Sequence, residues 1–366
     1  MWPPSPNEAP NEGEFFPGGA RPPRVVAIGG GTGLPVLLRG LRSMMFPPGQ
    51  GMPPSWRRDL LTALVTVADD GGSSGRLRRA YGVLAPGDIR NCLVALAENT
   101  QAAAMFDFRF EGSDGVAGHN LGNLILTALS HLEGRFPEAV ERAGEILGIR
   151  GRVLPATDSD VRLLAELADG SRVEGESRIA AARRRIRRVR LVPAAAAALP
   201  QARAAIADAE LVVIGPGSLY TSLIPVLLVR GIAEAIRRSG ARVLLVMNLM
   251  TEPGETDGMT AADHVRALRR HAPGLPIDDV LLAASPISPR VLAAYAACGA
   301  EPVAADLHAL RALGCRPVRQ RMVTARGRIR HEPRRLAAAV LGAAEEHRAG
   351  RQREQTREGH ALPARR

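Results

Sequence analysis

Apolar runs of strand length recur along this chain, and each is followed by a loop rich in glycine or polar residues. The runs are VVAI (25–28), LLTALVTV (60–67), LVVI (211–214) and RVLLVM (242–247). Stretches with helical periodicity lie between them, including residues 88–98, 120–133 and 260–271. This alternation is typical of a doubly wound α/β fold with a mostly parallel sheet.

The loops that follow these runs are residues 29–33, 69–75, 215–218 and 248–258. Parallel strands end at the same edge of a sheet, and doubly wound sheets bind ligands beyond that edge. We therefore expect the four loops to face one crevice and to form a binding site.

The alternation of strands and helices is interrupted once, at about residues 160–192. RLLAELADGSRVEGESRI alternates around a turn at Asp169-Gly170, and RIRRVRLV alternates again, which predicts a small antiparallel hairpin insertion with an added strand. The expected organisation is then a disordered Pro-rich N-terminus (1–24), one nucleotide-binding domain (25–330) that carries the insertion, and a solvated basic C-terminal tail (331–366).

The composition excludes several kinds of site. Every one of the 48 basic residues is arginine, so there is no Walker-type lysine and no Schiff-base lysine. A phosphate clamp must use arginine, backbone N–H groups or a metal ion. The three cysteines have no CxxC spacing, which favours reduced thiols over a disulfide framework or a zinc site.

Membrane and nucleic-acid partners are not expected either. The most apolar long run, residues 211–229, is interrupted by Gly215-Pro216-Gly217 and Pro225, whereas a membrane span needs about 20 uninterrupted apolar residues. The net charge is +11, but the basic stretch RRRIRRVR (183–190) has no interleaved aromatic residues. A soluble cytoplasmic protein is the expectation.

Two of the loops have the form of a phosphate cradle, with glycines between a strand and a helix. Backbone N–H groups and the helix dipole at such a turn attract anions. A purely structural tight turn is the alternative, because the full GxGxxG pattern is not met. The candidate phosphate-binding residues are Gly30, Gly31, Thr32 and Gly33 in the first loop, and Gly215, Gly217 and Ser218 in the second.

The stretch VADDGGSSGRLRR (67–79) is the candidate metal and phosphate loop. Asp69 and Asp70 are candidate Mg²⁺ ligands, while one of them could instead cap the turn. An Asx-type turn that caps a helix is the alternative for the whole loop. The further candidates here are Gly71, Gly72, Ser73, Ser74 and Arg76.

Three more segments carry hydrogen-bonding side chains at loop-to-helix or strand-to-loop junctions. They are GDIRN (87–91), GHNLGN (118–123) and NLMTEPGETDG (248–258), the last suited to a sugar or a base edge. A structural hydrogen bonder is the alternative for the histidine. No Ser-His-Asp triad can be assigned from the spacing. The candidate ligand-binding residues are Asn91, His119, Asn120, Asn248, Thr251 and Asp257.

These motifs together resemble one family. GGGTGLPVLLRGL, VTVADDGGSSGRLR, GDIRNCLVALA, GHNLGNLILTAL, RGRVLPAT, GPGSLYTSLIP and NLMTEPGETDG are similar, in order from Val25 to about residue 305, to the YvcK family of the CofD-like superfamily. Two positions depart from the family pattern: Met259 stands where tyrosine is common, and Val226 stands where asparagine is usual.

The resemblance implies a Rossmann-like three-layer α/β/α fold and a cytoplasmic protein that binds UDP-N-acetylglucosamine. It implies a regulatory role in cell shape and envelope synthesis during gluconeogenic growth, and leaves room for a homodimer and for a protein partner from the envelope-synthesis machinery. The alternative within the superfamily is a Mg²⁺-dependent transferase of the 2-phospho-L-lactate type. No other cofactor is expected.

Overall fold

The computed structural model describes residues 22–46, 55–113, 115–324 and 328–360, without the side chains of 55–56 and 351–360. Its centre is a seven-stranded sheet of order β10-β9-β8-β7-β1-β2-β3, in which every neighbouring pair is parallel. The strands are β1 (Val25–Gly29), β2 (Leu61–Val65), β3 (Arg152–Pro155), β7 (Leu211–Ile214), β8 (Arg242–Val246), β9 (Asp279–Ala283) and β10 (Arg316–Gln320).

The order of the strands reverses at β1. The chain runs outward from β1 through β2 to β3, and later returns to the other side of β1 with β7 before running outward to β10. In the register, Val25 lies opposite Leu61 on one side and Leu211 on the other. The carboxyl ends of β1 and β7 therefore flank a topological switch point, where doubly wound folds bind their ligands.

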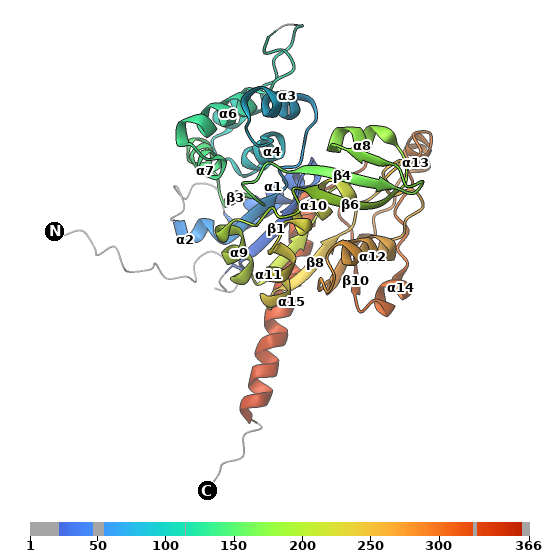
Figure 1. Cartoon of the computed structure of the whole chain (residues 1–366). Coiled ribbons are helices and arrows are strands. Elements are labelled where there is room, and N and C mark those ends of the chain that lie inside the picture. The colour runs from blue at the N-terminus through green and yellow to red at the C-terminus, as the bar shows by residue number, and fades with distance from the viewer. Residues whose placement is uncertain (1–21, 47–54, 114, 325–327, 361–366) are drawn as a thin grey trace, which may run out of the picture.

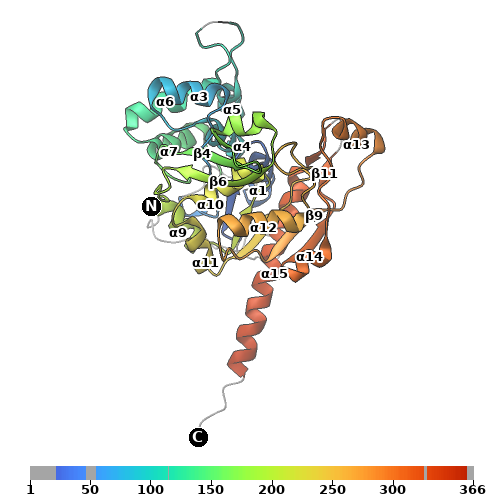
Figure 2. The same ribbon diagram turned by 45° about the vertical axis from the view of Figure 1, so that its right-hand side comes forward.

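Helices cover both faces of the sheet (Figures 1 and 2). On one side α1 contacts α4 and α15, and on the other α10 contacts α11 and α12. The helices of these two layers are α1 (Gly33–Met45), α4 (Gly87–Leu96) and α15 (Pro333–His360), and α9 (Pro200–Ala207), α10 (Ile224–Leu228), α11 (Ile232–Arg238) and α12 (Ala261–His271). The predicted three-layer α/β/α fold is confirmed.

A cluster of helices stands beside the β1–β3 half of the sheet, seen at the upper left of Figure 1. It contains α3 (Gly72–Tyr81), α5 (Thr100–Asp107), α6 (Leu121–Glu133) and α7 (Phe136–Leu147). The remaining helices are α2 (Ser55–Arg58), α8 (Glu176–Ala182), η1 (Leu219–Leu223), α13 (Pro289–Ala296) and α14 (Leu307–Ala312).

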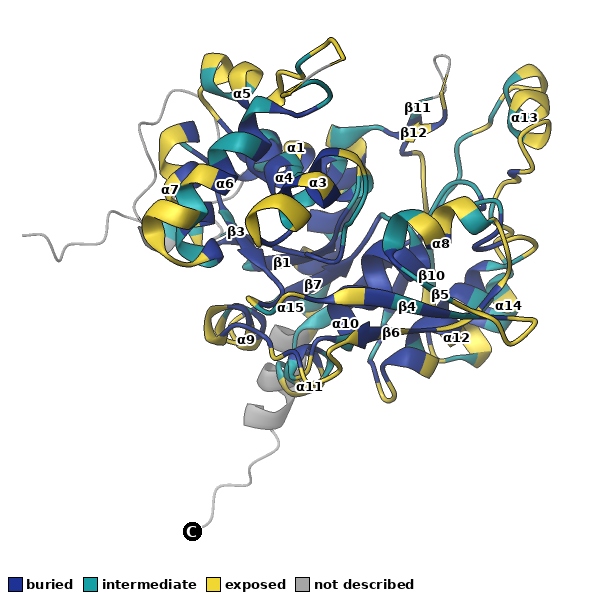
Figure 3. Ribbon diagram, turned by 45° about the horizontal axis from the view of Figure 1, so that its top comes forward, coloured by how far each residue is buried: buried dark blue, intermediate teal, exposed yellow. Residues whose placement is uncertain are grey.

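The core consists of aliphatic side chains from the central strands. Ile28, Leu64 and Val213 are fully buried between the two helical layers. Figure 3 shows these strands in the buried class and the outer helices with one exposed side. Strands covered on both faces are expected to be continuously apolar, as VVAI and LVVI are.

The insertion is confirmed as a three-stranded antiparallel sheet of order β5-β4-β6. Its strands are β4 (Arg162–Leu167), β5 (Arg172–Glu174) and β6 (Ile186–Val192), with α8 between the last two. Leu163, Ala165 and Val189 face inward and are fully buried, while polar residues alternate with them. The alternation arises because this sheet covers α10 with one face and meets solvent with the other.

The expectation of a solvated tail from residue 331 is wrong for its first part. After the short strands β11 (Val323–Thr324) and β12 (Arg330–His331), α15 packs along α1 and fully buries Leu336 and Val340. A Cβ atom on Gly40 of α1 would collide with the backbone carbonyl of Pro333, so that glycine allows the close approach. The apolar periodicity of LAAAVLGAA was masked by the arginines around it.

The expected disorder of residues 1–24 falls almost wholly on residues 1–21, which lie outside the described part of the chain, as do residues 361–366. Among the residues that the structure does describe, no helix is both long enough and apolar enough to cross a membrane.

Candidate functional site

A cleft of about 970 Å³ opens at the carboxyl ends of β1, β7 and β8. Both glycine loops line it, and so do segments that follow β8 and α13. The predicted site residues in its wall are Gly30, Gly31, Thr32, Gly33, Asn91, Gly217, Ser218, Asn248 and Thr251. Its volume is at the upper end of the range of about 300–1,000 Å³ typical of small-molecule sites.

The two glycine loops touch each other across the switch point. A Cβ atom on Gly33 would collide with the backbone carbonyl of Pro216, so no larger residue fits there. Gly31 has φ +62°, a conformation that L side chains rarely adopt. The second loop is held by Asn248, whose side-chain amide donates to the Gly217 carbonyl (2.9 Å) and whose Oδ1 accepts from the Gly217 N–H (3.2 Å). Gly215, with φ +83°, makes the turn into this loop.

One end of the cleft is basic. Arg39 projects from α1, and Arg330 comes from β12, more than 290 residues further along the chain. Burial, followed by the nearby Arg330 charge, lowers the pKa of Arg39. Two guanidinium groups close enough to repel each other gain stability when an anion lies between them. Tyr295 lies on the same wall, its hydroxyl held by the backbone N–H of Ile329 at 3.0 Å.

Acidic side chains gather beside the cleft, and one of them, Glu252, lines it. Burial and the nearby Asp69 raise the pKa of Asp88 to about 7, although the backbone N–H of Gly31 donates to its carboxylate. Burial, with the negative charge of Asp69, also raises the pKa of Glu176 in α8 to about 7. Burial raises the pKa of Glu252, which lines the cleft. A cation or a proton is therefore stabilised in this region.

The two predicted metal ligands, Asp69 and Asp70, have different surroundings. Asp70 Oδ1 accepts hydrogen bonds from the backbone N–H (2.9 Å) and hydroxyl (2.7 Å) of Ser177, and so joins this loop to α8. Asp69 Oδ1 accepts from the Gly71 N–H at 2.8 Å in an Asx turn, while Asp69 Oδ2 faces Gly87. Burial raises the pKa of Asp69.

In the described part of the chain, no group of three or more His, Cys, Asp or Glu side chains is arranged to hold a metal ion. Mg²⁺ is commonly bound by one or two carboxylates together with substrate phosphates. Asp69 fits that smaller role, since its Oδ2 faces Gly87, the neighbour of Asp88, whose carboxylate accepts from the first glycine loop at Gly31. Asp70 fits a structural role better, because Ser177 already uses its Oδ1.

The other predicted residues of the metal and phosphate loop lie beside the cleft and outside its lining. Ser73 Oγ is 2.9 Å from His119 Nδ1 and accepts from the Asn123 amide at 3.0 Å, all three being buried. Ser74 Oγ accepts from the Gly87 N–H at 3.1 Å. Gly71 and Gly72 begin α3. This network supports the loop that carries Asp69.

Two more of the predicted site residues, Asn120 and Arg76, lie next to this network. Asn120 donates to the backbone carbonyl of Asp107 at 3.1 Å, and Arg76 donates to that of Ala117 at 2.7 Å. Both bonds hold the loop that connects α5 to α6, which projects at the top of Figure 1. Neither side chain reaches the cleft wall.

Asp257 does not line the cleft. It lies on the far side of the 248–258 loop, in the wall of another pocket, and its Oδ2 accepts from the Gly254 N–H at 2.8 Å. Met259 lines that second pocket too, and Val226 is fully buried in α10. The two departures from the family pattern therefore lie away from the cleft.

Sequence reasoning missed several residues of the cleft wall, among them Arg39, Tyr295 and Arg330. It also missed Asp88, which lies outside the lining but against the first glycine loop. Asp88 stands inside the GDIRN motif, and its position at a helix start was a usable signal. Arg39 follows the first glycine loop by two helical turns. Tyr295 and Arg330 carry no local signal, because only the tertiary fold brings α13 and β12 over the loops.

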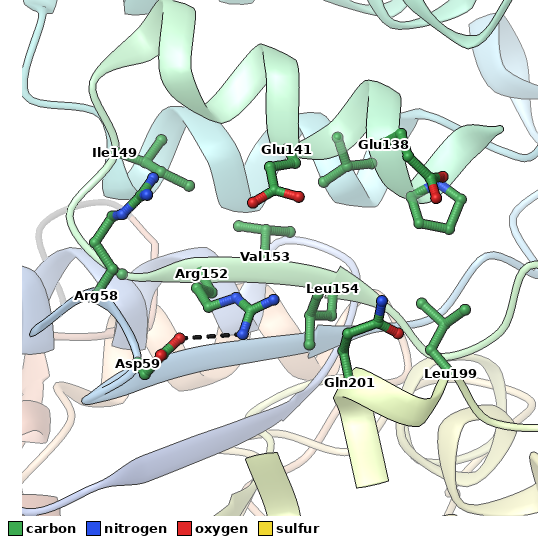
Figure 4. Close-up of a pocket in the computed structure, with 13 residues that line it drawn as sticks. Arg58, Asp59, Glu138, Glu141, Ile149, Arg152, Val153, Leu154, Leu199 and Gln201 are labelled. Atoms are coloured by element: carbon green, nitrogen blue, oxygen red, sulfur yellow. Dashed lines mark hydrogen bonds and ion pairs between the residues drawn. The ribbon is translucent and has the colours of Figure 1, made fainter. Parts of the chain in front are cut away.

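A smaller hollow of about 250 Å³ lies along the outermost strand β3, between it and α7 (Figure 4). Asp59 precedes β2 and Arg152 begins β3, and the two form an ion pair at 3.1 Å. The hollow lies on the outer side of β3, away from the switch point between β1 and β7 where doubly wound folds place their ligand sites. We assign no function to this hollow.

Comparison with known proteins identifies the family. The model of the family described as 2-phospho-L-lactate transferase CofD matches residues 25–323. The chain belongs to the CofD family. It is 45% identical over 319 residues to the gluconeogenesis factor of Halalkalibacterium halodurans, covering 87% of this chain and 95% of that protein.

Two further relatives agree. The gluconeogenesis factor of Bacillus subtilis is 42% identical over 321 residues, covering 87% of this chain and 97% of that protein. A crystal structure from Bacillus halodurans, described as a member of the UPF0052 family, superposes with a TM-score of 0.80 at 44% identity and covers 87% of this chain and 99% of that one. Within the CofD family the chain thus fits the YvcK branch of gluconeogenesis factors.

Proposed function

We propose that this protein binds a nucleotide sugar, UDP-N-acetylglucosamine, in the cleft and acts as a cytoplasmic regulator of envelope synthesis and cell shape during gluconeogenic growth. The observation that carries the proposal is the pair of interlocked glycine loops at the switch point, facing Arg39 and Arg330. Backbone N–H groups and two arginines suit a diphosphate, and the phosphates are the charged part of such a ligand.

The chemistry of the remaining walls fits the rest of the ligand. Tyr295 offers an aromatic ring, and Asn248 and Thr251 offer hydrogen-bonding groups for a base or a sugar. When Mg²⁺ is bound, it neutralises phosphate charge, and Asp69 is the residue that would hold it. Asp88 anchors the first glycine loop through the Gly31 N–H and so fixes where a phosphate can lie.

The test is calorimetric titration with UDP-N-acetylglucosamine, UDP-glucose, UDP and GDP, with and without Mg²⁺. Arg39→Gln removes one charge from the cleft, and a charge-assisted hydrogen bond contributes about 1.5–3 kcal/mol, so the affinity should fall roughly ten- to a hundredfold. The matched control is Arg238→Gln, because Arg238 lies in α11 with its side chain 80% exposed. Equal losses in the two variants, or no binding by the wild type, would refute the proposal.

One observation favours a second candidate, a CofD-type transferase: Asp88 lies against the first glycine loop with a pKa raised to about 7, as a proton acceptor or donor requires. Incubation of the protein with Mg²⁺ and the nucleotide sugar, followed by product analysis, separates the two. The regulator returns its ligand intact. Release of UMP or UDP that Asp69→Asn abolishes, and that Asp70→Asn retains, would establish the transferase.

A further inference from the structure

A second pocket, of about 380 Å³, lies between α12 and the start of β6, and its wall also includes η1 and the 255–259 loop. We call it the α12–β6 pocket. It is separate from the cleft, although the 248–259 segment borders both, with Thr251 and Glu252 on one side and Asp257 and Met259 on the other. None of the proposed chemistry of the cleft uses it.

The charge in this pocket is unbalanced. Arg185, Arg187, Arg266 and Arg270 line it, together with the acidic residues Asp257, Asp263 and Glu255. Both aspartates are already engaged: Asp257 by the Gly254 N–H, and Asp263 by Thr260 and Arg266. Arg187 pairs with Glu166 outside the pocket at 2.8 Å.

Arg185 and Arg270 are left without partners. Neither guanidinium makes a hydrogen bond or an ion pair with any other residue that the structure describes. Both lie close enough to Tyr220 for their charges to lower its pKa against the effect of burial. Two unpaired guanidinium groups therefore approach the pocket from different elements, one from the residue before β6 and one from α12.

A buried polar atom at the pocket points to the same conclusion. Glu255 is only 7% exposed and lines the pocket, and its Oε2 has no hydrogen-bond partner. Burial and the nearby Glu252 raise the pKa of Glu255 to about 8, which favours the neutral carboxylic acid over the carboxylate near pH 7. A neutral carboxyl group can donate a hydrogen bond, and an unpaired one in a buried place is costly.

We propose that the α12–β6 pocket is a second ligand site, which binds a small phosphate monoester through Arg185, Arg270 and the carboxyl group of Glu255. A phosphate monoester presents three acceptor oxygens, and guanidinium groups match that geometry with paired N–H donors. The pocket also has room for the organic part of a small sugar phosphate. This inference goes beyond the proposed function, because its ligand carries no nucleotide.

The test is titration of the full chain with glucose 6-phosphate, glycerol 3-phosphate and inorganic phosphate at pH 7 and low salt. The wild type should bind glucose 6-phosphate with saturation. The double variant Arg185→Gln/Arg270→Gln should weaken this binding at least tenfold. Both side chains are solvent-exposed, so the fold should be retained, and an unchanged melting temperature checks that.

Two control variants test whether a loss of binding is specific to the α12–β6 pocket. Arg172→Gln removes an exposed arginine from the same small sheet but outside the pocket, and should leave the affinity unchanged. Arg39→Gln alters the cleft, and should retain binding of glucose 6-phosphate. The inference is overturned if the wild type does not bind, if Arg172→Gln weakens binding as much as the double variant, or if only Arg39→Gln abolishes it. Because the probes lack a nucleotide, failure of UDP-N-acetylglucosamine to bind leaves this test intact.

Discussion

At the residue scale, the glycines of the first loop cannot be replaced by larger residues without a collision or an unfavourable backbone conformation. A Cβ atom on Gly30 would lie 2.6 Å from Asp88 Oδ2, and one on Gly33 would collide with Pro216. Gly31 has open space around its Cβ position, apart from Ser222 Oγ at 3.4 Å, but its φ of +62° is unfavourable for any L side chain. The loop thus combines two close approaches with one left-handed residue.

Gly31→Val should weaken ligand binding beyond its effect on stability. A β-branched residue at this φ costs roughly 1–2 kcal/mol or shifts the backbone, and the Gly31 N–H then moves away from Asp88. We expect a ten- to a hundredfold loss of affinity for UDP-N-acetylglucosamine in calorimetry. Gly82→Val is the matched control, because Gly82 has φ +65° at the end of α3, far from the cleft. Comparable affinity losses in both variants would contradict a specific role for Gly31.

Because His331 is buried, we expect the free energy of unfolding to depend on pH. Its side chain is 8% exposed, and burial lowers its pKa from 6.5 to about 4. The imidazole of the unfolded chain is therefore protonated below about pH 6.5. In the folded protein the same imidazole is protonated only below about pH 4. The stability that this neutral histidine contributes is complete above about pH 6.5 and is lost as the pH falls toward 4.

The expected difference is roughly 3 kcal/mol, since one pKa unit corresponds to about 1.4 kcal/mol. Chemical denaturation at pH 7.5 and pH 4 measures it. Between pH 7.5 and pH 4 the free energy of unfolding should fall in both proteins. The fall should be smaller in His331→Gln than in the wild type, by roughly 3 kcal/mol. His308→Gln, at an exposed position in α14, should behave as the wild type. Identical pH profiles for His331→Gln and the wild type would show that the buried imidazole is not the cause.

At the scale of elements, α15 completes one helical layer and also brings β12 to the cleft. Arg330 and His331 are separated from α15 only by Glu332, and α15 is fixed on α1 through the contact at Gly40. The sequence pointed to a tail here because Arg and Glu dominate residues 345–366, although the apolar positions of 336–344 follow a helical period. Docking of this helix therefore has a consequence for function, since it places one of the two cleft arginines.

Leu336→Ala should test this docking. Leu336 is fully buried, and truncating a buried leucine costs about 2–5 kcal/mol. We expect that loss of unfolding free energy in denaturant titration, together with weaker nucleotide-sugar binding. The matched control is Leu132→Ala, because Leu132 is 79% exposed in α6 and its truncation should change stability by less than about 0.5 kcal/mol. A small effect of Leu336→Ala would mean that α15 is not part of the core.

At the scale of the whole molecule, the parallel sheet and the edge that carries the glycine loops were predictable, whereas the convergence of distant segments was not. The glycine loops follow apolar runs, and this local pattern suffices to place them at one edge of a parallel sheet. The pattern says nothing about which face of the 248–258 loop meets the cleft, and Asp257 was misplaced for that reason. Tyr295 and Arg330 reach the cleft through packing over long sequence separation, which no local period encodes.

Because the cleft wall is assembled from the whole length of the chain, ligand binding should stabilise distant segments together. At a concentration one hundred times its Kd, UDP-N-acetylglucosamine should raise the free energy of unfolding by about 2.7 kcal/mol. Hydrogen exchange should then slow in residues 30–33, 216–218, 248–253 and 328–331 at once, since all four segments line the cleft. Uridine, which lacks the diphosphate, should leave exchange in the two glycine loops unchanged. Protection confined to one segment, or equal protection of the outer strand β5, would contradict a single shared site.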